Sequence, residues 1–254
     1  MNVKYFSFTN EGLQRKVNED SIYAFEKDKC AVFIVADGMG GYENGKTASD
    51  TIVKYVAKYI ELDMEKIVDA KKQFDKVYDS NTFYEDLKNC LLNANKDIFE
   101  NFTAKGHNSG STLIMMALYE DNYTIFSAGD SHIYQIIDND LVALTVDDVW
   151  ENDKEKIKDL TIDQVKNNPN YGRLTNAFGT IENVRINTTN GILTKGMKFF
   201  MCSDGIYKYC DKKILTELIT NEELKEKEFC NKIKEEVYKN EAPDNLSFIF
   251  IKVE

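Results

Sequence analysis

Four aspartates stand at the ends of apolar runs that have the composition of β-strands. Asp37 directly follows the run CAVFIVA, Asp204 follows KFFMCS, Asp244 precedes LSFIFI, and Asp130 lies in the short link between two further runs. Carboxylates at strand ends can meet at one edge of a sandwich, where they repel one another unless cations lie between them. The pattern predicts a divalent metal site, and ligands that are all oxygen favour magnesium or manganese over zinc or copper.

Two neighbouring features could complete such a site. Gly38 follows Asp37, and a glycine permits the tight turn that would bring its carbonyl oxygen toward a metal ion. Near the N-terminus, Arg15 precedes the pair Glu19 and Asp20. An arginine can bind two phosphoryl oxygens, while carboxylates can orient water on a metal. Taken alone, an Asp-Gly after a strand is more often an ordinary turn, and the N-terminal cluster is more often a solvated loop.

The apolar patterning predicts the elements that would position these residues. Strand-like runs cover residues 30–36, 112–118, 123–128, 132–137, 197–202 and 246–251. Helical periodicity covers residues 46–60, 83–102 and 214–238. Strands and helices do not alternate regularly, so a parallel α/β sheet is disfavoured. We expect an α+β sandwich with helices packed outside two sheets.

Two segments have weaker patterns. Residues 145–189 contain a charged stretch followed by NNPNYGR, which has turn chemistry at Asn168-Pro169. This pattern predicts a small mobile flap, with limits of roughly 146–190. Residues 62–81 are rich in lysine and aspartate, and we expect a solvated helix or a helix connection there.

Composition excludes several classes of protein. The chain has 254 residues, 43 acidic against 32 basic, and a net charge of -11, with no basic stripe for nucleic acid. No apolar run approaches the about 20 residues that cross a bilayer, and the first residues lack the features of a signal peptide, so we expect a cytoplasmic protein. The 5 cysteines show no CxxC spacing, and 2 histidines make a histidine-based metal site improbable.

The combination of motifs is more specific than its parts. From about residue 7 to residue 252 the sequence resembles the metal-dependent protein phosphatases of type 2C, bacterial type. The motifs that carry the resemblance, in the family's order, are GLQRKVNED at 12–20, VADGMGG at 35–41, GST at 110–112, AGDS at 128–131, LT at 144–145, RLTNAFG at 173–179, CSDG at 202–205 and PDNLSFI at 243–249.

The resemblance implies a single domain over residues 1–254, built as a four-layer α-β-β-α sandwich of two mainly antiparallel sheets. It implies two Mn2+ or Mg2+ ions: Asp37 would bridge them, the Gly38 carbonyl would bind one, and Asp204 with Asp244 would complete the other.

By the same resemblance, Glu19 and Asp20 would order water and Arg15 would bind the substrate phosphate. Bacterial members often bind a third, weaker ion through the aspartate that matches Asp130, together with the one that matches Asp204.

The implied reaction is hydrolysis of phosphoserine and phosphothreonine by a water activated between the two metals. Some members carry a histidine after the Asp-Gly as a proton donor, but this chain has Met39. We therefore expect the proton to come from water on a metal, and we expect His107 and His132 to be structural. His132 also replaces an arginine usual after AGDS, and Asp147-Asp148 replaces Asp-His, which puts flap packing and substrate contacts in doubt.

Two alternatives share the fold. A catalytically silent relative that binds phosphoproteins would lack a metal aspartate, and none is missing here. A phosphohydrolase of small metabolites would share the site and differ in its flap. The phosphatase interpretation implies phosphorylated proteins as substrates and a serine/threonine kinase that acts on the same targets.

Overall fold

Two antiparallel sheets form the centre of the molecule. The computed structural model describes residues 2–27, 29–40, 43–63, 79–107 and 109–254. The first sheet has the strand order β1-β12-β11-β8-β9 and the second has the order β10-β7-β6-β3-β2. The strands are β1 (Val3–Asn10), β2 (Ser21–Lys27), β3 (Cys30–Ala36), β6 (Leu113–Tyr119), β7 (Asn122–Ala128), β8 (His132–Ile137), β9 (Asp140–Ala143), β10 (Asn187–Ile192), β11 (Lys198–Cys202) and β12 (Leu246–Val253), with a short pair β4 (Gly38–Met39) and β5 (Gly110–Ser111).

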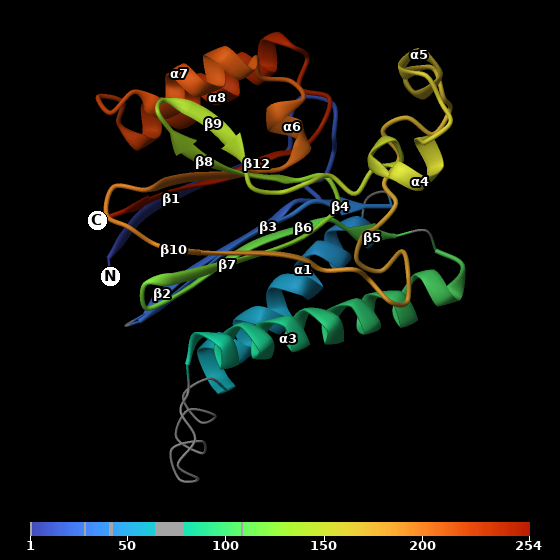
Figure 1. The fold of residues 1–254 in the computed structure, drawn as a ribbon, viewed down its shortest axis with the longest axis horizontal. Coiled ribbons are helices and arrows are strands. Elements are labelled where there is room, and N and C mark those ends of the chain that lie inside the picture. Colours follow the sequence, from blue (N-terminus) through green and yellow to red (C-terminus); the bar gives the residue numbers. More distant parts are fainter. Residues whose placement is uncertain (1, 28, 41–42, 64–78, 108) are drawn as a thin grey trace.

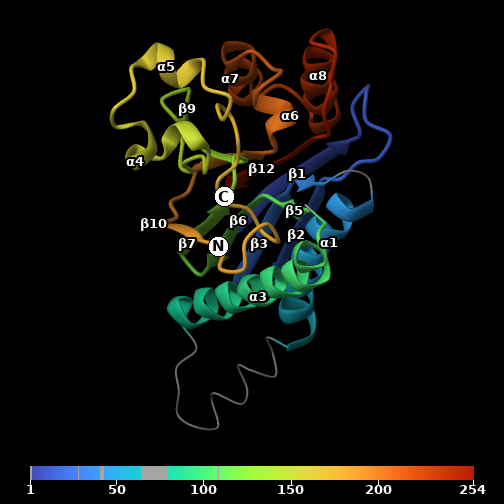
Figure 2. The same cartoon turned by 90° about the vertical axis from the view of Figure 1, so that its right-hand side faces the viewer.

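Helices cover both outer faces of the sandwich (Figure 1). The second sheet is covered by α1 and α3, and the first by α6, α7 and α8, as the turned view also shows (Figure 2). The predicted four-layer α-β-β-α sandwich is confirmed. The helical segments are α1 (Glu43–Lys58), η1 (Tyr59–Asp63), α3 (Ser80–Asn101), η2 (Thr103–Lys105), η3 (Trp150–Asn152), α4 (Lys154–Ile157), α5 (Ile162–Lys166), α6 (Asp204–Tyr207), α7 (Lys212–Thr220) and α8 (Glu226–Lys239).

Strand β3 is apolar throughout because both of its faces are covered. Successive side chains of a strand point to opposite faces. Val32 and Ile34 therefore pack against the α1 and α3 layer, while Phe33 and Val35 pack between the two sheets. A third cluster fills the space between the first sheet and α6 to α8. These buried layers hold the end of β3, and with it Asp37, in a fixed position.

The first and last strands pair along their whole length. The register runs from Val3 against Val253 to Asn10 against Leu246. Because the residues after β1 and those before β12 therefore leave the sheet at the same end, the N-terminal loop lies beside Asp244. Both chain ends lie at the opposite end of the sandwich from β4 and α6 (Figure 1).

Some sequence-based expectations differ from the observed elements. The helix expected over 214–238 is two helices, α7 and α8, because the chain turns at Asn221, whose side-chain oxygen accepts a hydrogen bond from the Glu223 amide at 3.0 Å. Strands β1, β2, β9, β10 and the short pair β4 and β5 lie outside the predicted runs. The expected connection over residues 62–81 lies mostly outside the described residues. No helix in the described part of the chain is long and apolar enough to cross a membrane.

The segment predicted as a flap contains η3, α4 and α5, which project at the end of the sandwich where β4 and α6 lie (Figure 1). An isolated bridge between Val149 and Leu174 closes its base. Strand β10 begins at Asn187, so the last residues of the range 146–190 belong to the second sheet. The limits and the independence of this flap stay a prediction.

Candidate metal and phosphate site

A pocket of about 370 Å3 gathers residues from seven separate parts of the chain. Seven of the eight residues singled out in the sequence line it, and the eighth, Asp20, is buried directly beside Ser203. The lining residues are Arg15, Glu19, Asp37, Gly38, Asp130, Asp204 and Asp244, together with Met39, Gly40, Thr112, Gly172, Leu174 and Lys208.

The Asp37-Gly38 turn is fixed by the adjacent GST segment at residues 110–112. The Asp37 amide donates to Thr112 Oγ1 at 3.1 Å, and the Asp37 carbonyl accepts from the Thr112 amide at 2.8 Å and from Ser111 Oγ at 3.1 Å. Gly38 pairs with Ser111 in the β4-β5 ladder. Because the Asp37 amide and the Asp37 carbonyl are both hydrogen-bonded, the backbone that carries the Asp37 side chain cannot rotate freely.

Gly38 must be a glycine because three chain segments meet there. A Cβ atom on Gly38 would lie 2.2 Å from the Gly45 carbonyl oxygen and 2.6 Å from that of Glu19. A Cβ atom on Gly45 would in turn lie 2.3 Å from Glu19 Oε1. The close approach brings the start of α1 and the Glu19 carboxylate against the Asp37-Gly38 turn, which residue spacing alone could not show.

Asn245 attaches the N-terminal loop to the last strand. Its Oδ1 accepts from the Glu19 amide at 2.9 Å, and its Nδ2 donates to the carbonyls of Glu11 and Val17 at 3.0 and 3.1 Å. Asn245 also donates its amide to Asp244 Oδ1 at 2.8 Å. In the sequence Asn245 is visible only as part of the motif PDNLSFI, yet it sets the relative position of Glu19 and Asp244.

Asp20 is held beneath the pocket. Its Oδ2 accepts from Ser203 Oγ at 2.9 Å, and its carbonyl accepts from Lys46 Nζ at 2.8 Å. Burial, opposed by hydrogen bonds from Ser247 and Ser203 and reinforced by Asp204 and Asp244, raises the pKa of Asp20 to about 7. The carboxylate is therefore unfavourable unless positive charge lies nearby.

The other acids of the pocket share this electrostatic situation. Burial, and then the nearby charges of Asp20, Asp204, Asp244 and Asp130, raises the pKa of Asp37 well above its usual value. Burial is also the main cause that raises the pKa of Asp130 and that of Glu19. The pocket is therefore built to favour cations, since bound positive charge would stabilise each of these carboxylates.

Two basic side chains form ion pairs with three of the carboxylates in the pocket, those of Asp130, Asp204 and Asp244. Arg15 donates from Nη2 to Asp244 Oδ2 at 2.8 Å and from Nε to the Pro243 carbonyl at 3.3 Å. Lys208 Nζ lies 3.0 Å from Asp130 Oδ2 and 2.8 Å from Asp204 Oδ2. With these acids turned toward protein cations, no three His, Cys, Asp or Glu side chains among the described residues form a closed metal-binding group.

Three carboxylate oxygens nevertheless point to a missing partner. Glu19 Oε1, Asp20 Oδ1 and Asp204 Oδ1 are buried and have no hydrogen-bond partner among the described residues. A buried charged oxygen without a partner costs several kcal/mol, on the order of what a metal or an ordered water would offset. The donor atoms are all oxygen, which fits hard divalent cations such as magnesium and manganese.

Comparison with known proteins decides the family. The family model described as "Protein phosphatase 2C" matches residues 13–247 of the chain. The chain belongs to this family. The serine/threonine phosphatase stp of Listeria innocua is 25% identical over 214 residues, which cover 83% of this chain and 81% of that protein.

Solved structures share the fold. The S. agalactiae serine/threonine phosphatase has a TM-score of 0.84 at 21% identity and covers 100% of both chains. The catalytic domain of the phosphatase PstP, solved in complex with 2 manganese ions, has a TM-score of 0.76 at 20% identity and covers 99% of both chains.

The predicted class of enzyme, a metal-dependent phosphatase of phosphorylated proteins, is confirmed by this membership. Nothing in the comparisons favours the catalytically silent relative or the metabolite hydrolase.

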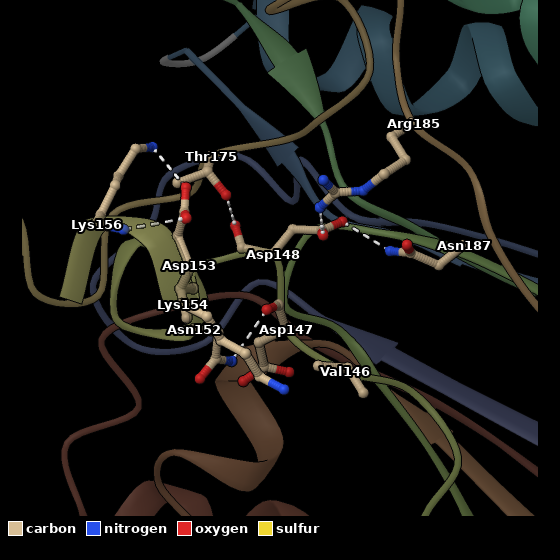
Figure 3. Close-up of a pocket in the computed structure, with 11 residues that line it drawn as sticks. Val146, Asp147, Asp148, Asn152, Asp153, Lys154, Lys156, Thr175, Arg185 and Asn187 are labelled. Carbon is tan, nitrogen blue, oxygen red and sulfur yellow. Dashed lines mark hydrogen bonds and ion pairs between the residues drawn. The ribbon is translucent and has the colours of Figure 1, made fainter. Parts of the chain in front are cut away.

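In this type 2C phosphatase, Asp148 connects the flap to the turn that carries Asp130. Its buried carboxylate pairs with the Arg185 guanidinium and accepts from Asn187 Nδ2 at 3.0 Å (Figure 3). The same carboxylate accepts from Asn176 Nδ2 at 2.7 Å. It also accepts from the Gly129 amide at 3.2 Å. Asp148 lines a second pocket of about 420 Å3 with Thr175 and Asn152. Asp148 therefore holds residues 176–187 against the turn before β8.

The two histidines make contacts outside the lining of the pocket. His132 Nε2 lies 2.6 Å from Asp147 Oδ1, Nδ1 contacts the Tyr134 hydroxyl, and the ring stacks on Tyr207 at 3.9 Å. His107 is exposed near the end of α3. Neither histidine lines the pocket of the phosphatase, whereas Met39 does.

Proposed function

We propose that this phosphatase hydrolyses phosphoserine and phosphothreonine with two Mn2+ or Mg2+ ions held by Asp37, the Gly38 carbonyl, Asp204 and Asp244. The observation that carries the assignment is the set of three buried carboxylate oxygens without partners, which belong to Glu19 and Asp204 in the pocket and to Asp20 beneath it. When bound, two such ions lower the pKa of a water between them, so that hydroxide is supplied at neutral pH.

The chain's own residues bind and orient the reactants. Arg15 lies at the pocket with its guanidinium on Asp244. Once ions neutralise Asp244, the planar fork can turn to two phosphoryl oxygens, a geometry that arginine matches well. Glu19 and Asp20 each hold one buried oxygen ready to accept a hydrogen bond from ordered water.

The flap contributes to substrate binding in this proposal. Gly172 and Leu174 line the pocket from the flap, so the residues around a phosphorylated serine or threonine would contact this segment. We further propose a cytoplasmic location and a serine/threonine kinase that phosphorylates the same targets, since removal of a phosphate requires a reaction that adds it.

The test measures hydrolysis of p-nitrophenyl phosphate and of a phosphothreonine peptide with and without Mn2+. We expect activity that a chelator abolishes and that Asp37→Asn lowers at least about a hundredfold, because charge stabilisation at the phosphate is the dominant effect in such reactions. Asp140→Asn is the control, since the Asp140 side chain is 70% exposed on β9.

Folded protein with no Mn2+-dependent hydrolysis of either substrate would refute the proposal. A comparison of kcat/KM for phosphopeptides and for sugar phosphates distinguishes the protein substrate from a small metabolite, and we expect the phosphopeptides to be preferred.

A further inference from the structure

Lys208 forms an ion pair with two buried carboxylates at once. Its ammonium nitrogen lies 3.0 Å from Asp130 Oδ2 and 2.8 Å from Asp204 Oδ2. The Asp130 and Asp204 side chains are only 8% and 18% exposed, while that of Lys208 is 42% exposed. The Lys208 ammonium therefore lies between the two carboxylates and pairs with both.

The local fold makes this contact. Lys208 follows α6 and lies four residues after Asp204, so the two side chains project from the same face of the turn. Tyr207 donates its hydroxyl to the Asp130 carbonyl at 2.9 Å, which fixes α6 against the turn between β7 and β8. The His132 ring stacks on Tyr207 from the other side. The position of the Lys208 amine is thus set by several contacts and is not that of a freely solvated lysine.

We infer that the Lys208 ammonium occupies the cation position shared by Asp130 and Asp204, so that this enzyme takes two divalent ions and not three. This inference rests on the proposed function, because it concerns the number of ions that the same pocket holds. Lys208 is a positioning residue for the two acids, with no direct role claimed in the chemistry.

The two oxygens of Asp204 support this division. Oδ2 is held by Lys208, whereas Oδ1 is buried without a partner. Asp204 can therefore bind an ion through Oδ1 while Oδ2 remains paired with the Lys208 ammonium. Asp130 Oδ2 accepts a hydrogen bond from the same ammonium.

A third divalent ion at the same two oxygens would meet the ammonium at close range. Coulomb repulsion between the singly charged ammonium and a doubly charged ion at about 4 Å, with an effective dielectric constant of about 20, weakens binding on the order of a millionfold. An ion could enter only if Lys208 left both carboxylates. Replacement of Lys208 by a neutral residue should therefore open a third ion site.

The experiment counts Mn2+ ions bound per chain by isothermal titration calorimetry, with electron paramagnetic resonance of the free ion as a second count. We expect two ions for the wild-type enzyme and three for Lys208→Ala, the third weaker than the others. The double variant Lys208→Ala with Asp130→Asn should return to two. Lys212→Ala is the matched control, because Lys212 lies one turn further along and its amine is 3.9 Å from Asp140; we expect two ions there.

Each result bears on the inference. Three ions in the wild-type enzyme, or only two in Lys208→Ala, would overturn it. If Lys208→Ala does not fold, Lys208→Gln keeps the length of the stem and removes the charge, and the same count applies. Absence of any Mn2+ binding by the folded wild-type chain would instead overturn the proposed function itself, which separates the two failures.

Discussion

Replacement of Asp20 by asparagine should flatten the pH dependence of stability in the ion-depleted enzyme. The carboxyl of Asp20 is 2% exposed, and its pKa rises from 3.8 to about 7 in the folded chain, chiefly through burial. A carboxyl with a higher pKa in the folded chain binds more protons there than in the unfolded chain. Its stabilising contribution is therefore complete below about pH 4 and is lost as the pH rises to about 7.

The size of the effect follows from the two pKa values. At about 1.36 kcal/mol for each pH unit, the part lost between pH 5.5 and pH 7 is about 2 kcal/mol, and little changes above pH 7. For a chain of this length, about 2 kcal/mol corresponds to roughly 4 to 8 °C in Tm.

The assay is urea unfolding of wild type and Asp20→Asn at pH 5.5 and pH 8.0 in the presence of a chelator. The free energy of unfolding of the wild type should fall by about 2 kcal/mol more than that of the variant. Any hydrogen bond lost in the variant cancels, because it is lost at both pH values. Profiles that are parallel to within about 0.5 kcal/mol would refute the electrostatic argument for the pocket.

Two further substitutions test the frame of the site. Asp148→Asn should lower the free energy of unfolding by about 1 to 2 kcal/mol, because the buried Asp148 carboxylate accepts from Arg185, Asn176 and Asn187 and an amide cannot accept all of these bonds. Thermal unfolding measures this loss, with the exposed Asp163→Asn as control. Gly205→Ala should reduce both Tm and Mn2+-dependent turnover, because the new Cβ would lie 1.9 Å from the Asn245 carbonyl oxygen. Gly205 follows Asp204 and Asn245 follows Asp244, so the clash would push these two predicted metal ligands apart. Unchanged turnover in Gly205→Ala would contradict this packing.

The sequence predicts the central strands and the aspartates at their ends well, because both are marked by short runs of neighbouring residues. Strand β3 is apolar on both faces, so its end and the position of Asp37 follow directly from the run of residues. Strand β10, by contrast, has the polar sequence NTTNGI at the sheet edge, and it is recognised only through its pairing with β7.

Contacts between distant residues explain what the sequence could not provide. Arg15 and Asp244 are 229 positions apart, and the pairing of β1 with β12, together with the bonds of Asn245, brings them together. Lys208 lies one turn after Asp204, a spacing that is visible in the sequence, but its second partner, Asp130, is 78 positions away. Asn245 supports the N-terminal loop through backbone carbonyls, which leave no signature in residue type.

The pairing of β1 with β12 also bears on how the enzyme is made. Because Arg15 comes early in the chain and Asp244 comes just before β12, a nascent polypeptide on the ribosome carries most of its acids long before it can close the pocket. Long-range strand pairing of this kind is slow compared with local helix formation. Catalytic activity should therefore appear only after β12 has left the ribosome and paired with β1 and β11. A partly synthesised phosphatase could then not act on other proteins.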